Sequence, residues 1–190
     1  MKNQKSTIKT LNKNKKIKEV KIIENKIKQN IKDFKNFKIT LNDNIFTSKN
    51  KIMGFEGIAS VNYWEAVSLL LPDEINFKNR NQKPENDVVN SMLNYGYAIL
   101  ASEIAKNIVT LGLDPYCGLL HADLKRRQSL IFDLIEEFRQ QIVDKTVFKL
   151  INTNQINETN IDKRNNSLKL ESRKLLAGEI MPKIHSDLTF

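Results

Sequence analysis

Hydrophobic residues recur every three or four positions through most of the chain, which is the period of an amphipathic α-helix. This pattern predicts helices over residues 17–34, 51–71, 87–111, 129–152 and 168–184. In the fourth of these, the inward positions are Leu130, Ile131, Leu134, Ile135, Phe138 and Ile142. No stretch alternates with the two-residue period of a half-buried strand. The pattern therefore predicts an all-α fold.

Polar segments separate the predicted helices. Residues 38–50 cluster Asn, Asp, Ser and Thr and are expected to form a loop or turn, and residues 153–166 form a linker rich in Asn and Thr. Asp87 is a suitable N-cap for the third helix, and Gly112 is suited to end it. His185 is expected to lie in an exposed tail beyond the last helix.

Three residues inside the third helix have poor helix propensity, namely Asn90, Asn94 and Gly96. They indicate close helix packing or polar contacts at these positions. The alternative is that the helix merely tolerates them.

The composition suits a globular protein, with 40% hydrophobic residues and 28% charged residues. Cys117 is the only cysteine, which excludes an internal disulfide and a multi-cysteine zinc site. No apolar run approaches the roughly 20 residues of a membrane helix, and no apolar segment follows the basic N-terminus as in a signal peptide. We therefore expect a cytoplasmic protein without a membrane partner.

The net charge of +9 is concentrated at one end of the chain, because residues 2–51 hold nearly half of the basic residues. We divide the chain into a basic, low-complexity segment over residues 1–50, consisting of an amphipathic helix and a linker, and a helical domain over residues 51–190. The lysine-rich helix could pack on that domain, contact a nucleic-acid backbone or remain a solvated charged surface. An AT-rich coding bias would also raise the number of lysines.

Candidate chemistry centres on residues 118–139, where His121 precedes the basic cluster 125–127 and a helix that carries Asp133 and Glu136. A histidine and carboxylates beside basic residues can bind a divalent metal next to a phosphate. The alternative is a solvated acidic helix face preceded by a loop histidine.

Glu56 is a second candidate, because its neighbours in sequence are mostly apolar. A carboxylate in such surroundings requires an ion pair, a hydrogen bond or a metal. The alternative is an acidic residue near a helix N-terminus, where the helix dipole favours it.

Four segments in order resemble the C-terminal helical domain of a known family, the CRISPR-associated spacer-acquisition integrase. They are GFEGIASVNYW, NDVVNSMLNYGY, GLDPYCGLLH and RRQSLIFDLIEEFRQQIVDKTV. The resemblance covers residues 51–152, with a looser similarity around residues 168–176. It implies a metal-dependent DNA endonuclease and integrase of CRISPR adaptation, which inserts spacer DNA at the repeat array by transesterification.

The resemblance also implies a set of site residues. Glu56 matches the acid of the family's G-x-E-G motif, His121 the histidine of its G-F-L-H motif and Glu136 the first glutamate of its D-L-x-E-E-F-R motif. These three would be catalytic and would hold Mg²⁺ or Mn²⁺, with Asp133 as a supporting acid. The polar positions that would contact DNA are Arg127, Ser129 and Arg139, although Arg139 could instead form an ion pair with Glu136 or Asp133.

The implied partners are DNA, in the form of spacer fragments, the CRISPR repeat and branched DNA, a second copy of the chain, and the small second acquisition protein. Family members usually also carry an N-terminal β-domain, and the lysine-rich segment is expected to stand in its place here. That segment is expected to match the family's linker and first helix, preceded by unrelated sequence. A truncated gene product or one half of a split integrase is therefore expected as an alternative.

Two other functions remain open. One is a DNA-binding remnant without catalysis, in which the basic helix and the arginines hold the DNA backbone. The other is a helical interaction protein without a role in DNA chemistry, which would leave Glu56, His121 and Glu136 unexplained.

Overall fold

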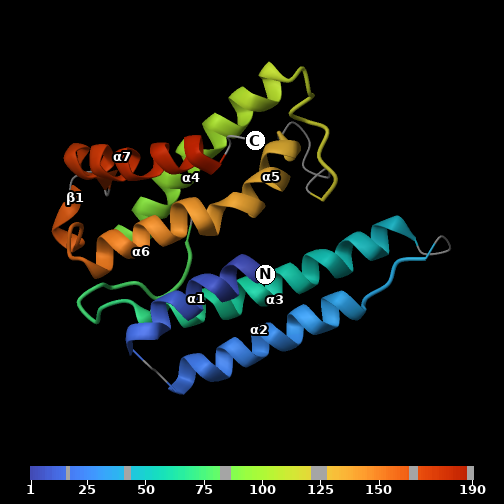
Figure 1. The fold of residues 1–190 in the computed structure, drawn as a ribbon, viewed down its shortest axis with the longest axis horizontal. Helices are drawn as coiled ribbons and strands as arrows, with labels where there is room; N and C mark the ends of the chain where they lie inside the picture. The colour runs from blue at the N-terminus through green and yellow to red at the C-terminus, as the bar shows by residue number, and fades with distance from the viewer. Residues whose placement is uncertain (16–17, 41–43, 82–86, 121–127, 163–166, 188–190) are drawn as a thin grey trace. The chain divides into compact units, whose positions relative to one another are not determined.

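The computed structural model describes residues 1–15, 18–40, 44–81, 87–120, 128–162 and 167–187, which form two compact units, residues 1–70 and 71–190. Helices dominate both units, and the strands among the described residues are two residues long, so the all-α prediction is confirmed (Figure 1). The first unit contains α1 (Lys2–Lys15), α2 (Lys18–Asn36) and α3 (Ile45–Leu70). The second contains α4 (Val88–Thr110), α5 (Ser129–Arg139), the π-helical segment η1 (Gln140–Asp144), α6 (Lys145–Asn152), the 3₁₀ turn η2 (Glu158–Asn160), β1 (Ile161–Asp162), β2 (Ser167–Leu168) and α7 (Leu170–Asp187).

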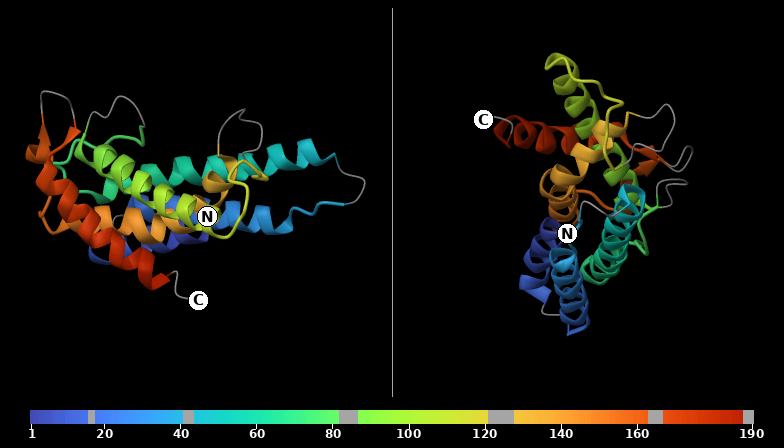
Figure 2. Two further views of the ribbon diagram at one scale, coloured as in Figure 1. Left: turned by 90° about the horizontal axis from the view of Figure 1, so that it is seen from above. Right: turned by 90° about the vertical axis from the view of Figure 1, so that its right-hand side faces the viewer.

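In the first unit, α2 lies alongside α3 and also contacts α1 (Figure 2). Val20, Ile23 and Ile27 of α2 are buried, as the helical period predicts. The next inward position is occupied by Asn30, whose side-chain amide donates to the backbone oxygen of Phe55 at 2.7 Å. The predicted amphipathic helix is confirmed, and its buried face includes one hydrogen-bonded polar residue.

Helix α3 begins at Ile45, so the prediction of a loop throughout residues 38–50 is wrong for the last six of them. The side chain of Asn44 accepts a hydrogen bond from the backbone nitrogen of Phe46 at 2.8 Å, and its backbone oxygen accepts from Ser48 at 3.0 Å. The side chain of Asn44 thereby satisfies one of the amide groups that the first helical turn leaves without a partner, and its backbone oxygen accepts the first i→i−4 bond of the helix. Polar residues that resemble a loop in sequence are here the cap and first turns of a helix.

The apolar pattern of residues 51–71 predicts that Met53, Ile58, Val61, Trp64, Ala66, Val67, Leu70 and Leu71 face inward, and the first three of these do not. Met53, Ile58 and Val61 are 39%, 56% and 70% exposed. The later positions of the predicted face, Trp64, Ala66, Val67, Leu70 and Leu71, are buried as expected, and Ala59 and Tyr63 are buried in addition. Because α3 is apolar around much of its circumference, its sequence does not identify a single inward face.

Both predicted ends of α4 are confirmed. Asp87 accepts a hydrogen bond from the backbone nitrogen of Asn90 at 2.7 Å and caps the N-terminus. At the other end Gly112 has a φ of +70°, and the backbone nitrogen of Leu113 donates to Ile108 at 3.0 Å. This is the bonding pattern of a Schellman cap, whose left-handed residue favours glycine.

Gly96 of α4 marks a close approach between helices. A Cβ atom at this position would lie 2.5 Å from Val143 Cγ1 and 3.1 Å from Ile180 Cδ1, below ordinary van der Waals contact. Asn90 and Asn94 accept hydrogen bonds from Arg80. The close packing and polar contacts predicted from these three low-propensity residues are therefore confirmed.

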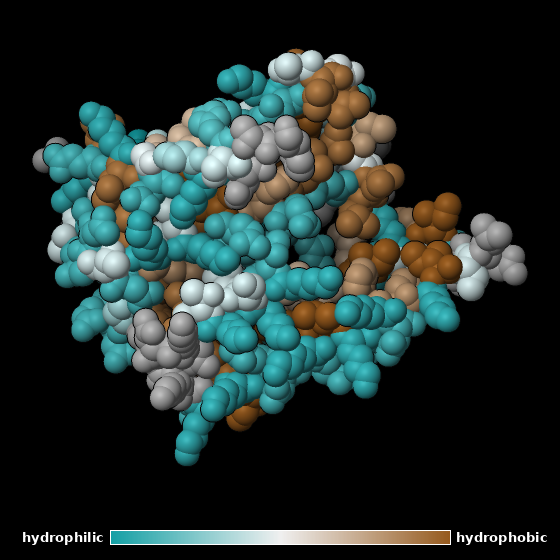
Figure 3. Space-filling model, viewed as in Figure 1, coloured by the Kyte–Doolittle hydropathy of each residue, from teal (hydrophilic) through white to brown (hydrophobic). Residues whose placement is uncertain are grey.

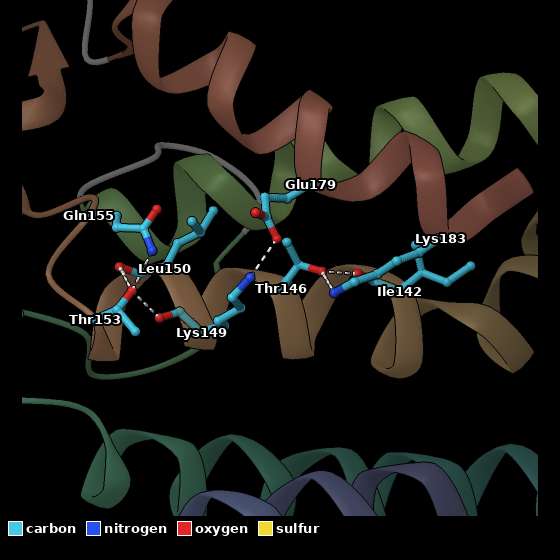
Figure 4. A network of polar contacts seen from close by, with 8 residues as sticks. All are labelled: Ile142, Thr146, Lys149, Leu150, Thr153, Gln155, Glu179 and Lys183. Atoms are coloured by element: carbon cyan, nitrogen blue, oxygen red, sulfur yellow. Dashed lines mark hydrogen bonds and ion pairs between the residues drawn. The ribbon is translucent and has the colours of Figure 1, made fainter. Parts of the chain in front are cut away.

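The segments α5, η1 and α6 follow one another without a break, which confirms a helical run to Asn152. Helix α7 packs against α6, where Lys149 pairs with Glu179 at 2.8 Å and Lys183 donates to Thr146 Oγ1 at 2.6 Å (Figure 4). The last helix is thus confirmed. His185 is exposed but lies within α7, so the prediction that it belongs to a tail is wrong.

The short strands β1 and β2 pair in antiparallel orientation, with Ile161 opposite Leu168 and Asp162 opposite Ser167. They lie in and beside the segment predicted as a polar linker. Within the described residues no helix is long and apolar enough to cross a membrane.

Exposed hydrophobic side chains gather at the end of α4 and in the segment that follows it, seen at the upper right of Figure 3. They include Leu111, Leu113, Tyr116 and Leu119. Hydrophilic side chains predominate over α2 in the lower part of the same view.

Candidate functional site

Glu136 lies on α5 in an ion pair with Arg139, whose Nη1 is 2.6 Å from Glu136 Oε1. Both side chains are partly buried, with 18% of Arg139 and 29% of Glu136 exposed. The ion pair confirms one of the alternatives for Arg139 raised by the sequence. Because the pair is partly shielded from water, it is expected to be stronger than an exposed pair.

Asp133, one turn before Glu136 on α5, holds the chain that precedes His121. Its Oδ2 accepts hydrogen bonds from the backbone nitrogens of Leu119 at 2.6 Å and Leu120 at 3.1 Å. Successive amide groups that converge on one carboxylate fix the local path of the backbone. Asp133 therefore anchors the chain to within one residue of His121.

Ser129 anchors the same segment slightly earlier. It is 1% exposed, donates to the backbone oxygen of Tyr116 at 2.7 Å and accepts from the backbone nitrogen of Gly118 at 3.0 Å. A Cβ on Gly118 would lie 2.6 Å from the carbonyl carbon of Ser129, so only glycine allows the loop to approach α5 this closely. The hydroxyl of Ser129 is thus engaged with the loop backbone.

Glu56 lies in the first unit, on α3, and its side chain is partly buried. The neighbouring Phe55 forms edge and tilted ring contacts with Phe34 and Phe37, at centroid distances of 5.8 and 6.0 Å. Asn30 also donates to the backbone oxygen of Phe55. These contacts fix the turn of α3 that carries Glu56.

His121 and Arg127 lie outside the described residues. Among the residues that the structure does describe, no three His, Cys, Asp or Glu side chains lie close enough together to bind a metal. Of the three ligands implied by the resemblance, Glu56 belongs to one unit and Glu136 to the other.

Next to Glu136 the structure contains a polar network that the sequence analysis did not assign to the site. Tyr97 of α4 donates to Asp144 Oδ1 at 2.5 Å, and Asp144 is fully buried. Burial raises the pKa of Tyr97 well above its ordinary value of 10.0, and the charge of Asp144 raises it further. Tyr97 therefore remains a protonated donor over the whole physiological pH range.

Two guanidinium groups lie against the ring of Tyr97, with Cζ of Arg80 at 5.4 Å and Cζ of Arg139 at 5.9 Å from the ring centroid. Arg80 is held by Asn90 Oδ1 at 3.0 Å and Asn94 Oδ1 at 2.5 Å. Burial lowers the pKa of Arg80, while Tyr97 and Asp144 act in the opposite direction. The low-propensity asparagines of α4 were one sequence signal for this network, and two of the segments that resemble the family contain Tyr97 and Asp144.

The family model and the curated relatives that match this chain belong to the same family. The family model described as CRISPR associated protein Cas1 matches residues 1–180. CRISPR-associated protein Cas1 3 of Methanobrevibacter ruminantium is 56% identical over 179 residues, which are 94% of this chain and 54% of the relative. CRISPR-associated endonuclease Cas1 1 of Archaeoglobus fulgidus is 42% identical over 146 residues, or 73% of this chain and 42% of that protein.

The chain thus spans about half the length of the curated relatives it matches. The family match begins at residue 1, so the expectation of unrelated sequence before the first family helix is wrong. The family match therefore includes the lysine-rich segment as well as the helices that follow it.

Solved structures of similar fold include a casposase bound to its integration product, with a TM-score of 0.64 and 33% identity over 70% of this chain and 41% of that chain. A CAS1 protein from Thermotoga maritima has a TM-score of 0.71 over 95% of this chain and 53% of its own. Its identity of 24% supports a shared fold alone.

Proposed function

Since this chain belongs to the Cas1 family of CRISPR-associated proteins, we propose that it is the helical part of a divalent-metal-dependent DNA endonuclease and integrase of CRISPR adaptation. The reaction is phosphoryl transfer to a DNA strand. In integration a 3′-hydroxyl of a spacer fragment attacks a phosphorus of the repeat, a new P–O bond forms, and the 3′-oxygen of the cut strand leaves. In hydrolysis, water takes the place of the hydroxyl.

The observation that carries this proposal is the pair of hydrogen bonds from Leu119 and Leu120 to Asp133. Asp133 and Glu136 are three residues apart on α5, so their side chains project from neighbouring positions on the helix. The backbone just before His121 is therefore tied to the helical turn next to Glu136. This supports the assignment of His121 and Glu136 to one site, and Glu56 is assigned to the same site from its match to the family's G-x-E-G motif alone.

Two carboxylates and one imidazole suit Mg²⁺ or Mn²⁺, with the imidazole favouring Mn²⁺. The bound ion would stabilise negative charge on the phosphoryl oxygens during transfer. Glu56, His121 and Glu136 would be its ligands and the catalytic residues. Asp133 and Ser129 would hold the loop and Arg127 would contact a DNA phosphate, whereas the DNA contact expected for Arg139 would require its remaining N–H donors, because Nη1 is paired with Glu136.

DNA is the proposed partner, as spacer fragments, the CRISPR repeat and branched DNA. The casposase of similar fold was solved with an integration product, which supports a nucleic-acid substrate for this chain as well. Homodimerisation and binding of the small second acquisition protein remain part of the proposal.

A second candidate function, DNA binding without turnover, is favoured by the outer surface of α2. At 100° per residue, Lys18, Lys21, Lys28, Lys32 and Lys35 fall within an arc of about 100° and along about 25 Å. Glu19, Lys26 and Asp33 lie on the other side of the exposed surface, where Asp33 is bonded to Gln29 at 2.8 Å, and Glu24 lies about 20° beyond one edge of the lysine arc. Coding bias can raise the lysine count, but it does not place lysines on one arc. We call these five lysines the lysine face.

Strand transfer and cleavage of branched DNA distinguish the two candidates. The wild type is expected to act only with Mn²⁺ or Mg²⁺, and His121→Ala and Glu136→Gln are expected to lose this activity. Glu137→Gln is a matched control, because it removes an exposed carboxylate next to Glu136. Salt-sensitive DNA binding without metal-dependent turnover in the wild type would contradict catalysis by this chain and support the second candidate.

A further inference from the structure

Arg139 connects Glu136 to a polar network that includes Tyr97, Asp144 and Arg80. Its Nη1 bonds Glu136 and its guanidinium lies against the ring of Tyr97. In the orientation that satisfies both groups of its amide, Gln140 accepts from Arg139 Nε at 3.0 Å. The guanidinium is therefore constrained on several sides, and a planar group held in this way presents its N–H donors to Glu136 in a defined direction.

The ring that supports Arg139 is itself held in place. The hydroxyl of Tyr97 is bonded to the buried Asp144, and Arg80 lies against the same ring. A cation–π contact is stronger when it is shielded from water than when it is exposed. Two like charges near one ring repel each other, and the buried carboxylate of Asp144 offsets that repulsion.

The local backbone explains how Asp144 reaches Tyr97. Residues Gln140–Asp144 form a π-helical segment, which widens the helix and changes the direction of the side chains that follow. Gly96 lets α4 approach Val143 within this segment. Tyr97, the next residue, is thereby brought to Asp144.

We propose that Tyr97 and Asp144 are positioning residues, which act through Arg139 to orient the carboxylate of Glu136 as a metal ligand. This inference rests on the proposed function, because it takes Glu136 to be a ligand. Residues that support a ligand from outside typically change metal affinity or activity by about 10–100-fold when they are replaced.

The first test asks whether Tyr97 orders Arg139, and it requires no metal. In NMR spectra of the wild type, the Arg139 Nε–H resonance is expected to be resolved and shifted by the ring current. Tyr97→Leu should remove this shift, and Tyr97→Phe should retain only part of it, because phenylalanine keeps the ring but lacks the hydroxyl that is bonded to Asp144. Tyr95→Leu on the same helix is the control. An unchanged Arg139 resonance in a folded Tyr97→Leu variant would overturn the inference.

The second test is a double-mutant cycle on Mn²⁺ affinity, measured by electron paramagnetic resonance. Tyr97→Leu and Arg139→Met are each expected to weaken Mn²⁺ binding by about 10-fold, and the double variant should be no weaker than Arg139→Met alone. Additive effects would mean that Tyr97 does not act through Arg139, and would overturn the inference.

One outcome of the Mn²⁺ binding experiment would contradict the proposed function as well as the inference. If Mn²⁺ binding to the wild type does not depend on Glu136, as tested with Glu136→Gln, Glu136 is not a ligand and the inference fails with the proposed function. If binding depends on Glu136 but is unchanged in Tyr97→Leu, only the inference fails.

Discussion

The carboxylate of Asp133 accepts a hydrogen bond from the backbone nitrogen of Leu120, the residue immediately before His121. A second bond, from Leu119 to the same oxygen, makes Asp133 an anchor for the chain that leads to a proposed ligand. In this role Asp133 would not bind the metal itself. It would fix the backbone position of Leu120, from which the chain continues to His121.

Replacement of Asp133 should therefore reduce activity in a protein that remains folded. Asp133→Ala removes the acceptor of both hydrogen bonds, and we expect strand transfer to fall by about 10-fold or more. The unfolding free energy should fall by only about 1–2 kcal/mol, because the loop is largely exposed and water can take the place of the carboxylate. Asp133→Asn keeps an oxygen acceptor and should retain more activity than Asp133→Ala. Equal losses of activity in the two variants would contradict an anchoring role.

The close approach of Gly96 to Val143 predicts opposite effects for two glycine substitutions. Gly96→Ala should destabilise the protein by about 1–3 kcal/mol, because the added methyl group overlaps Val143 and Ile180. Gly178→Ala on α7 is the matched control, since its added Cβ meets no atom within 4 Å. It should stabilise the helix by about 0.5–1 kcal/mol. The free energy of unfolding of both variants is measured by urea denaturation. An unchanged free energy for Gly96→Ala would show that α4 can move away from Val143 and Ile180 without destabilising the protein.

Glu158 should make stability depend on pH in the acid range. Burial raises its pKa above the ordinary value of 4.5, and the charge of Asp87 adds to this effect, while the hydrogen bond from the Asn76 backbone nitrogen opposes it. Between the unfolded and the folded pKa of Glu158 the native state binds more protons at this group. The contribution of Glu158 to stability is therefore most favourable below pH 4.5 and declines as pH rises through the raised pKa.

This pH dependence is measured by urea unfolding of wild type and Glu158→Gln from pH 4 to 7. The variant carries no titrating group at this position, so its unfolding free energy should decrease less with rising pH. Glu171→Gln, which removes an exposed carboxylate on α7, controls for the change in net charge. Parallel profiles for wild type and Glu158→Gln would contradict the assignment.

The lysine face of α2 predicts a change in the salt dependence of DNA binding. Replacing Lys21, Lys28, Lys32 and Lys35 with Gln should reduce the slope of log affinity against log salt by about 0.9 for each duplex phosphate that these lysines neutralise in the wild type. The control replaces four exposed lysines of the second unit, namely Lys78, Lys106, Lys169 and Lys174. This control variant, also with Gln at each position, removes the same number of positive charges as the α2 variant. Equal slopes for the two variants would mean that net charge, and not this surface, determines binding.

Much of the helical framework could be predicted from sequence, because it depends on local interactions. The ends of α4 follow from the capping chemistry of Asp87 and the left-handed conformation of Gly112. The inward positions of α2 follow from the helical period. In each case the residues that determine the structure are close together in the chain.

The start of α3 and its buried face could not be predicted in the same way. Asn44 belongs to a polar cluster typical of loops, and only its bonds to Phe46 and Ser48 identify it as a cap. The exposed Ile58 and Val61 fit an apolar face as well as the buried residues do. A helix that is apolar on several sides acquires its inward face from its neighbours.

By itself, the sequence determined the helical class and the family, and it named Glu56, His121 and Glu136 through motifs that need no tertiary information. Only the tertiary structure revealed that Asp133 binds the backbone before His121, and that Arg139 joins Glu136 to Tyr97. The physical reason is distance along the chain: Tyr97 and Asp144 are far apart in sequence, and their hydrogen bond exists only because Gly96 allows two helices to pack closely.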